Sequence, residues 1–455
     1  MTGRTIDIGA LIEGRGLSGF NYQLIVLSWL ITVFDGFDMM TISYTAPYLA
    51  DQFHLDKTML GAIFSAGTAG MMLGGFAFTW LGDWIGRRPA LLLTGFIFGV
   101  LTILTGLAGS YESFLWLRFL DGLAIGGMLP LAWALNIEFV PKSMRSSVVT
   151  VIMIGYSIGT SLGGPITVML APRYGWPAVY YAGGLGSLLA SALLLWRLPE
   201  SVRFLVSRAR SPARIAALLN RMRPEVGADA ADRFILGAEP VAREPFKPRQ
   251  LFAGRLLYIT PLLWVGYIAS TLAIYLVVNW SPTLFEQMHF ARSTAAYVAS
   301  AGSLLGGLTG LALMRLTDGK GPVAVAFCPI IVIPVLLTVG LLQPAHAALI
   351  PLTLLATLLI VGGHYGVHSI ASIYYPTAIR ASGGGWATSI AKFGGIAGPM
   401  IGGVLLQAGV TAMRIFAFLA VCPAVLAACA LGIAFIVRRA SLVALPAAAA
   451  VAPES

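Results

Sequence analysis

Long apolar blocks alternate with short polar connections along most of the chain. Leu24–Ala46, Pro89–Gly109 and Val148–Leu170 are typical, each about 20 residues long and able to cross about 30 Å of hydrocarbon as a helix. The pattern predicts an all-α membrane protein with twelve transmembrane helices. The expected spans are 24–50, 58–81, 89–109, 114–140, 146–170, 177–198, 256–283, 293–316, 322–342, 347–375, 382–408 and 412–437.

Composition agrees with this fold class, because 58% of the residues are hydrophobic and only 11% are charged. The net charge of +10 alone would also suit a nucleic-acid partner. However, if the N-terminus is cytoplasmic, the outside connections hold only Lys57, Arg173, Arg292 and Arg414. Such a bias sets the orientation of membrane proteins. We therefore expect a multi-pass protein of the bacterial inner (plasma) membrane, with cytoplasmic termini, a lipid bilayer around it and no nucleic acid.

The second half of the chain repeats the first at an offset of 235 positions. Identical polar residues and prolines coincide at this offset: Pro47 with Pro282, Gln52 with Gln287, His54 with His289, Asp83 with Asp318, Pro141 with Pro376, and Arg145 with Arg380. An apolar background does not produce such matches, so we infer a duplicated six-span unit. Parallel repeats of this kind place a substrate cavity between the halves near the membrane midplane.

The repeat predicts two pseudo-symmetric six-helix bundles, at 1–198 and 255–440. Residues 199–254 between them are charged and rich in proline, so we expect a cytoplasmic linker with short amphipathic helices. The Ala-, Val- and Pro-rich stretch 441–455 is expected to be a disordered tail.

Charges inside the spans are the strongest functional candidates, because an ion at the bilayer centre costs at least about 2.5–3.5 kcal/mol. Asp35 and Asp38 lie in the first span at a spacing that places both on one helix face. Arg118 lies in the fourth span, one turn before Asp121. We predict that Asp35 and Asp38 exchange protons and that Arg118 pairs with Asp38. The alternatives are carboxylates fixed structurally by a cation, and an Arg118 that reaches outward to the interface.

Lys392 lies deep in an otherwise apolar, Gly-rich eleventh span. A carboxylate substrate would be a natural partner for it, and structural pairing with an aspartate is the alternative. Other polar side chains are candidates for the substrate cavity, although each also suits ordinary packing: Tyr44, Asn136, Tyr156, Asn279, His364 and His368. His364 and His368 share a helix face without an acidic or cysteine cluster, so we expect no metal.

Glycines recur every fourth residue in two spans related by the repeat. They are Gly155, Gly159 and Gly163 in the fifth span, and Gly394, Gly398 and Gly402 in the eleventh. Small residues at this spacing let helices approach closely. We interpret both sets as packing devices.

The connection after the second span reads Leu81-Gly-Asp-Trp-Ile-Gly-Arg-Arg88, with a weaker copy at 316–321. It resembles the cytoplasmic signature of the major facilitator superfamily. The segments 138–145 and 199–204 resemble charge clusters with which members of that superfamily close the cytoplasmic side. The resemblance implies a cytoplasmic gate made of Asp83, Arg87, Arg88, Glu138, Arg145, Glu200, Arg203, Asp318 and Arg380. We expect the acids Asp83, Glu138 and Glu200 to pair with Arg87, Arg145 and Arg203 when the outside is open.

The first span narrows the resemblance. Asp35-Gly-Phe-Asp38, together with the fourth-span pattern around Arg118 and Gly122, is similar to the motifs of the aromatic acid:proton symporters. That family often has Arg where Lys392 stands. The resemblance implies uptake of a small aromatic carboxylate, such as a benzoate, hydroxybenzoate, phenylpropanoate or phenoxyacetate, by alternating access. It also implies a monomer that is driven by the proton gradient and needs no cofactor.

Two other readings remain open. The cargo of a major facilitator carrier could be a sugar or a non-aromatic organic anion, because Pro199-Glu-Ser201 also occurs in sugar carriers. A non-transporting receptor or a membrane enzyme belongs to a different class of protein. We expect no enzyme, since the sequence offers neither a nucleophile–base set nor a metal-ligand cluster.

Overall fold

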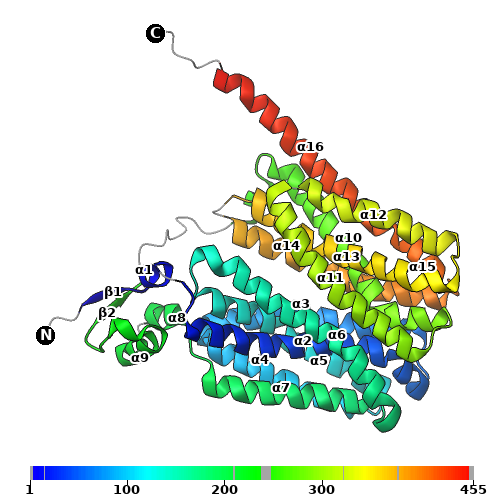
Figure 1. Ribbon diagram of the computed structural model, residues 1–455, viewed down its shortest axis with the longest axis horizontal. Helices are drawn as coiled ribbons and strands as arrows, with labels where there is room; N and C mark the ends of the chain where they lie inside the picture. Colours follow the sequence, from blue (N-terminus) through cyan, green and yellow to red (C-terminus); the bar gives the residue numbers. More distant parts are fainter. Residues whose placement is uncertain are drawn as a thin grey trace. The chain divides into compact units, whose positions relative to one another are not determined.

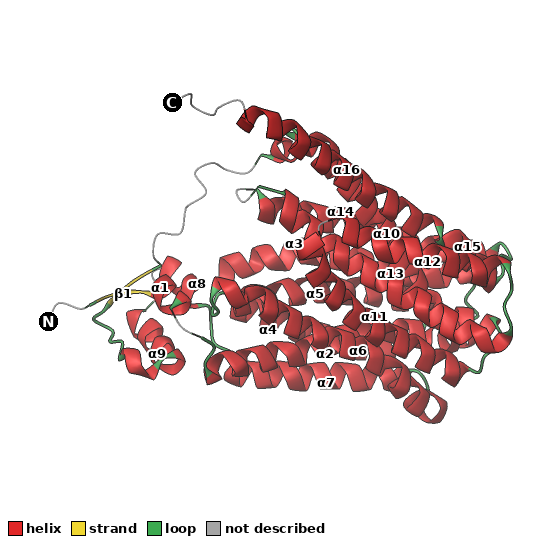
Figure 2. Ribbon diagram, turned by 45° about the horizontal axis from the view of Figure 1, so that its top comes forward, coloured by secondary structure: helices red, strands yellow, loops and turns green. Residues whose placement is uncertain are grey.

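The computed structural model describes residues 4–14, 16–208, 211–236, 247–320, 322–376 and 379–449, and these are almost entirely helical (Figure 2). Side chains are described for most of them; exceptions include His368, Asp318 and Arg380, three of the expected site residues. Within this part of the chain, twelve helical segments are long and apolar enough to cross a membrane, and they coincide with the twelve predicted spans to within a few residues. The predicted fold class is therefore confirmed.

The first six spanning helices are α2 (Gly19–Phe53), α3 (Lys57–Ile85), α4 (Arg87–Gly106), α5 (Tyr111–Ile137), α6 (Arg145–Tyr174) and α7 (Pro177–Arg197). The second six spans are formed by α10 (Leu256–Gln287), α11 (Arg292–Lys320), α12 (Pro322–Leu341), α13 (His346–Tyr374), α14 (Arg380–Gln407) and the pair α15 (Ala412–Leu419) and α16 (Val421–Ala449) (Figure 1). The last span is broken just before Pro423, which is tolerated in the first turn of the new helix.

The chain divides into two units. Unit 1 comprises Met1–Leu55 and Ala66–Arg243, and unit 2 comprises Asp56–Ser65 and Glu244–Ser455. The division falls inside the predicted linker, and the beginning of α3 groups with the second unit. The linker thus belongs mainly to unit 1, where the sequence had suggested a separate segment.

The helix boundaries reproduce the sequence repeat. The helices α3, α4, α5 and α6 begin at positions 57, 87, 111 and 145, and α11 to α14 begin 235 positions later, at 292, 322, 346 and 380. His54 and His289, which coincide at this offset, both adopt positive φ, at 52° and 65°. Two histidines in the sparsely populated left-handed region at equivalent helix ends are evidence of a duplicated backbone.

The glycine series brings helices into close contact in each unit. In unit 1, Gly159 of α6 faces the carbonyl of Val33 on α2, where a Cβ atom would overlap the oxygen. In unit 2, Gly394 and Gly398 of α14 face the carbonyls of Ile268 and Leu272 on α10 in the same way. The packing role predicted for these glycines is confirmed.

A small structure that the sequence analysis did not predict joins the N-terminus to the linker. Strand β1 (Thr5–Asp7) pairs in parallel with β2 (Arg233–Ile235), and α1 (Ile8–Glu13) follows. The linker adds α8 (Val202–Ser207), α9 (Pro212–Met222) and the 3-10 turns Pro224–Val226 and Pro248–Phe252. Figure 1 shows α1, α8 and α9 together, and we call the end of unit 1 where they lie the linker end.

An ion pair and hydrogen bonds hold this N-terminal strand in place. The Arg4 backbone N–H donates to the Asp232 carboxylate at 2.8 Å, and the Arg4 guanidinium donates to the carbonyl of Gly227 at 2.7 Å. The backbone N–H of Asp229 and then the Arg4 groups lower the pKa of Asp232. The amphipathic helices expected in the linker are present, since α9 buries Ile215, Leu219 and Met222 and exposes Arg214.

The expected disordered tail differs from the structure. Helix α16 continues to Ala449, well into the stretch 441–455. Alanine has the highest helix propensity, so an alanine-rich segment that follows a membrane helix prolongs it.

We predict that Gly159→Ala lowers the thermal stability of the purified protein, because the added methyl group must push α6 away from Val33 of α2. Overpacking of this kind costs about 1–3 kcal/mol. Gly384→Ala in α14 is the matched control, since nothing lies within 4 Å of its added Cβ. The midpoint of thermal unfolding in detergent checks both variants. Equal midpoints for the two would contradict the close-packing account.

Candidate functional site

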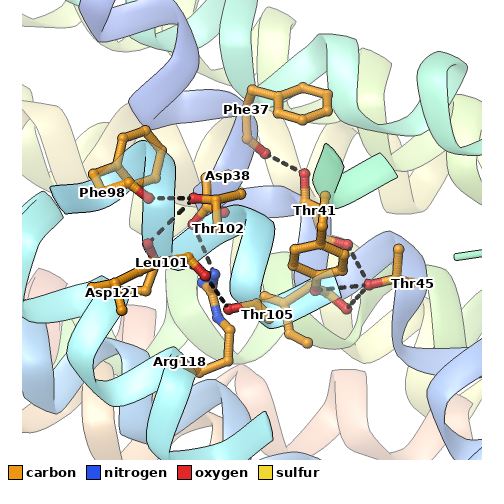
Figure 3. Close-up of polar contacts among 12 residues, drawn as sticks. Phe37, Asp38, Thr41, Thr45, Phe98, Leu101, Thr102, Thr105, Arg118 and Asp121 are labelled. Carbon is orange, nitrogen blue, oxygen red and sulfur yellow. Dashed lines mark hydrogen bonds and ion pairs between the residues drawn. The ribbon is translucent and has the colours of Figure 1, made fainter. Parts of the chain in front are cut away.

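Three charged side chains form a buried ionic cluster in the core of unit 1. Arg118 Nη1 donates to Asp38 Oδ2 at 2.8 Å and to Asp121 Oδ2 at 2.7 Å (Figure 3). Asp38 and Arg118 are 1% and 3% exposed, and Asp121 is fully buried. The predicted pair between Asp38 and Arg118 is therefore present, and Asp121 joins it as a second carboxylate. We refer to these three residues as the Asp38–Arg118–Asp121 trio.

The trio follows from the placement of its helices. Arg118 and Asp121 are three residues apart on α5, so their side chains leave the same helix face. Asp38 reaches Arg118 from the middle of α2. Close packing also contributes, because a Cβ on Gly122 of α5 would overlap the carbonyl of Gly67 on α3.

Hydroxyl groups surround the charged side chains. Thr102 of α4 donates to Asp121 Oδ1 at 3.3 Å, as Figure 3 shows. Thr45 of α2 and Tyr180 of α7 share a hydrogen bond of 3.1 Å nearby. Four helices of one unit therefore supply polar groups to this region. Such groups can donate to a carboxylate or accept from a protonated one.

The charges of the trio do not balance when both carboxylates are ionised, because two negative charges face one guanidinium. A buried uncompensated charge is expensive. Binding of one proton to either carboxylate would make the trio neutral. Asp35, the other predicted proton carrier, is fully buried on the same helix, but the ion pairs of Arg118 are with Asp38 and Asp121.

The predicted substrate-binding residues of unit 1 tie helices together. Tyr44 Oη donates to the carbonyl of Thr160 on α6 at 3.2 Å, and Asn136 Nδ2 donates to Ser28 Oγ at 2.6 Å. Tyr44 is 3% and Asn136 is 1% exposed. Tyr156 is half-buried on α6. The packing alternative therefore accounts for the observed contacts of Tyr44 and Asn136.

The remaining predicted substrate-binding residues belong to unit 2. Lys392 lies half-buried on α14, and Asn279 is buried on α10. The ring of His364 on α13 shares a hydrogen bond of 3.1 Å with Ser270 of α10. His368 lies outside the described side chains. Among the described residues, no group of three or more His, Cys, Asp or Glu side chains is arranged to hold a metal ion.

Several predicted gate residues meet at the linker end of unit 1. Arg87 forms ion pairs with Asp83 and with Glu138, the second at 3.5 Å, and Ser201 donates to the other Glu138 oxygen. Glu200 accepts from the backbone N–H groups of Ser201 at 2.8 Å and Arg88 at 3.2 Å. Partial burial raises the pKa of Glu200.

The pairing expected for Arg145 is not seen. Among the residues that the structure describes, Arg145 has no ion pair, and its Nε atom has no hydrogen-bond partner. Glu138 pairs instead with Arg87, which is anchored beside it at the start of α4. Arg203 is half-buried in α8. Asp318 and Arg380 lie outside the described side chains.

Comparison with known proteins decides the family. The model of the Major Facilitator Superfamily matches residues 28–399. The chain belongs to this superfamily. It is 31% identical to the gallate transporter of Pseudomonas putida, over 94% of both chains. It is 32% identical to the 4-hydroxybenzoate transporter PcaK of Pseudomonas aeruginosa, over 89% of this chain and 90% of that one.

These relatives place the chain among the aromatic acid transporters of the superfamily, as the motifs of the first and fourth spans had suggested. The fold agrees with a solved structure. A bacterial homologue of the human lysosomal transporter Spinster superimposes with a TM-score of 0.70 at 15% identity, over 93% of this chain and 98% of that one.

We predict that Arg118→Gln destabilises the protein strongly, because it leaves two buried carboxylates without their cation. Breaking a buried pair in this way costs about 3–5 kcal/mol. Arg118→Gln combined with Asp38→Asn and Asp121→Asn should recover much of that loss, since no buried charge of the trio remains. The midpoint of thermal unfolding in detergent compares the parent protein, Arg118→Gln and the triple variant.

The matched control is Arg292→Gln, which breaks an ion pair with Glu286 of 3.1 Å on a side chain that is 37% exposed. An exposed pair contributes about 0–1 kcal/mol. If Arg118→Gln were no more destabilising than Arg292→Gln, the trio would not be the costly buried cluster described above.

Proposed function

We propose that this protein takes up small aromatic carboxylates through a bacterial inner membrane by proton-coupled alternating access. The observation that carries the proposal is the Asp38–Arg118–Asp121 trio, in which one guanidinium is bonded to two buried carboxylates. The aromatic class of the cargo is supported by the relatives, which are named as carriers of gallate and 4-hydroxybenzoate. Both termini are cytoplasmic in this proposal, as the distribution of basic residues favours.

Coupling to protons has a physical reason. Moving a monoanion into a cell that is negative inside costs about 2.3 kcal/mol per 100 mV of membrane potential. One proton carried with each anion cancels the transported charge. The trio is suited to hold that proton, because protonation of one carboxylate removes its excess negative charge.

Proton binding also changes the contacts of Arg118. A neutral Asp38 or Asp121 attracts the guanidinium less strongly, so the bond between α2 and α5 weakens when Asp38 takes the proton. An element with two such arrangements can bias a conformational equilibrium. In this proposal Asp38 is the proton carrier, Arg118 senses its state, and Asp121 keeps Arg118 in place.

The carboxylate of the substrate is assigned to Lys392 of α14. A cation in an apolar, glycine-rich span is the complement that an aromatic carboxylate requires. The ammonium group of a lysine is a compact charge, whereas an arginine offers two parallel donors. A lysine therefore restricts the orientation of the carboxylate less than an arginine would.

The first test is uptake into proteoliposomes. We expect radiolabelled 4-hydroxybenzoate to accumulate only with an inward proton gradient, and we expect Asp38→Asn to abolish accumulation while retaining some exchange of internal for external substrate. Asp51→Asn, an exposed aspartate on the same helix, is the matched control and should accumulate normally. Full gradient-driven accumulation by Asp38→Asn would refute its assignment. If gallate, benzoate and 4-hydroxybenzoate all failed to enter with folded protein, the aromatic cargo would be wrong.

A second test addresses Lys392. We predict that Lys392→Gln raises the KM for 4-hydroxybenzoate at least tenfold, because the carboxylate loses its charged partner, while Lys392→Arg keeps transport with a smaller change. A charge-assisted hydrogen bond is worth about 1.5–3 kcal/mol, which corresponds to that factor or more. Initial uptake rates against substrate concentration give the KM. Equal KM values for the Gln variant and the parent protein would remove Lys392 from the binding site.

A further inference from the structure

A basic cavity lies at the linker end of unit 1, away from the Asp38–Arg118–Asp121 trio. It has a volume of about 540 Å³ and opens where the start of α4, the segment after α7 and helix α9 meet. Three arginines, Arg88, Arg214 and Arg221, and one acid, Glu200, are its charged lining residues. The proposed transport cycle uses neither Arg214 nor Arg221.

The three arginines form no ion pair with a described residue. Arg88 donates to the carbonyls of Leu195 and Leu198 at 2.7 Å, which caps the end of α7. Within the described residues, the Arg221 side chain donates to neutral oxygens, on Gln23 at 3.3 Å and Arg197 at 3.4 Å, and its guanidinium lies 5.8 Å from the ring centre of Phe20. Among the residues that the structure describes, the exposed side chain of Arg214 has neither a hydrogen bond nor an ion pair.

Glu200 does not cancel these charges either. Its Oε1 atom accepts from the backbone N–H groups of Arg88 and Ser201, and it forms no ion pair within the described part of the chain. With three arginines and one carboxylate, the lining of the cavity is positive at neutral pH. A cavity of this charge attracts an anion with several acceptor oxygens.

The surroundings of the cavity identify the source of such an anion. Helix α7 ends just before the lining residue Leu198, and it exposes large apolar side chains, with Leu189 72% and Trp196 84% exposed. Trp80 and Trp84 stack at the end of α3, 66% and 62% exposed, and Ile85 beside them lines the cavity. Exposed tryptophans of this kind mark the boundary between hydrocarbon and water.

Helix α9 completes the arrangement, because it lies at the linker end (Figure 1). Its apolar face is buried, and its arginines Arg214 and Arg221 are exposed. A ligand in the cavity would thus have its charged group among arginines and its apolar part along α7. A diacyl lipid with an anionic headgroup has both features. Basic pockets at helix ends are a known mode of headgroup recognition.

We propose that this cavity binds the phosphate group of an anionic phospholipid, with Arg214 and Arg221 as its free cations and Arg88 at its base. The acyl chains lie along the exposed apolar face of α7. The bound lipid would hold α9, and with it the linker, against the start of α4 and the end of α7. A soluble phosphate ester carries the same charged group, so the test must separate the two sources.

The test measures lipid retention by the full-length protein in detergent, by native mass spectrometry. Phosphatidylglycerol is titrated against phosphatidylcholine with the same acyl chains. We expect selective binding of phosphatidylglycerol, and we expect the double variant Arg214→Gln, Arg221→Gln to weaken it about fivefold for each arginine removed. Arg233→Gln, an exposed arginine of β2 outside the cavity, should bind like the parent protein.

Two comparisons test the proposal: competition by a soluble phosphate ester, and lipid retention by the variants. Glycerol 3-phosphate in large excess should not displace the lipid, because it has no acyl chains to contact α7; displacement at equal affinity would overturn the lipid assignment. Equal retention by the double variant and by Arg233→Gln would overturn the site. Thermal unfolding of each variant checks that the protein is still folded, and Arg214→Gln alone gives a second measurement that leaves the hydrogen bonds of Arg221 intact.

Discussion

Hydrocarbon offers no hydrogen-bond partner to a polar group, and the structure of this protein follows from that constraint. Every span is a helix, which satisfies the backbone within itself. Threonine hydroxyls in the spans bond back to the preceding turn, as Thr32 does to Ser28 and Thr41 to Phe37. Ionised groups must find one another, and Asp38, Arg118 and Asp121 do so at 2.7–2.8 Å. Helices can meet this closely because glycines at their contacts remove the side chains that would hold them apart.

Features with a strong local signal were predictable from the sequence. The length of the apolar blocks predicts the spans. Polar residues that recur at one offset predict the duplication. The Asp38–Arg118 pair was predictable because few charges in the spans exist to be paired. Contacts between distant surface segments were not. The pairing of β1 with β2 joins short, weakly patterned segments, and its hydrogen bonds link residues 228 positions apart. The spacing of Asp121 from Arg118 places the two on one helix face, but it does not predict that one nitrogen of Arg118 binds both Asp38 and Asp121.

The duplicated scaffold carries different chemistry in its two units. At the offset of 235, the positions of Asp35, Asp38, Arg118 and Asp121 correspond to Ser270, Ala273, Thr353 and Ala356. The second unit therefore keeps the helices and loses the ions. Thr353 bonds to the carbonyl of Leu349, and two alanines take the places of the trio carboxylates. Ser270, at the position of Asp35, bonds to His364. Conversely, Lys392 corresponds to Ser157. Each unit thus contributes charges that the other lacks.

This division explains how coupling can arise without contact between proton and substrate. In the proposed cycle, Asp35 stays protonated and neutral. The empty carrier then has a trio of charge −1 and a lysine of charge +1, and these charges sum to zero. When both the proton and the substrate anion are bound, the trio is neutral and the lysine–carboxylate pair is neutral, so the net charge is again zero. With only the proton bound the net charge is +1, and with only the anion bound it is −1. Since a buried net charge is expensive in a membrane, the two charged states are the ones least able to change conformation. In this proposed cycle, obligatory coupling follows from the count of charges, and it requires that both sites be shielded from water during the change.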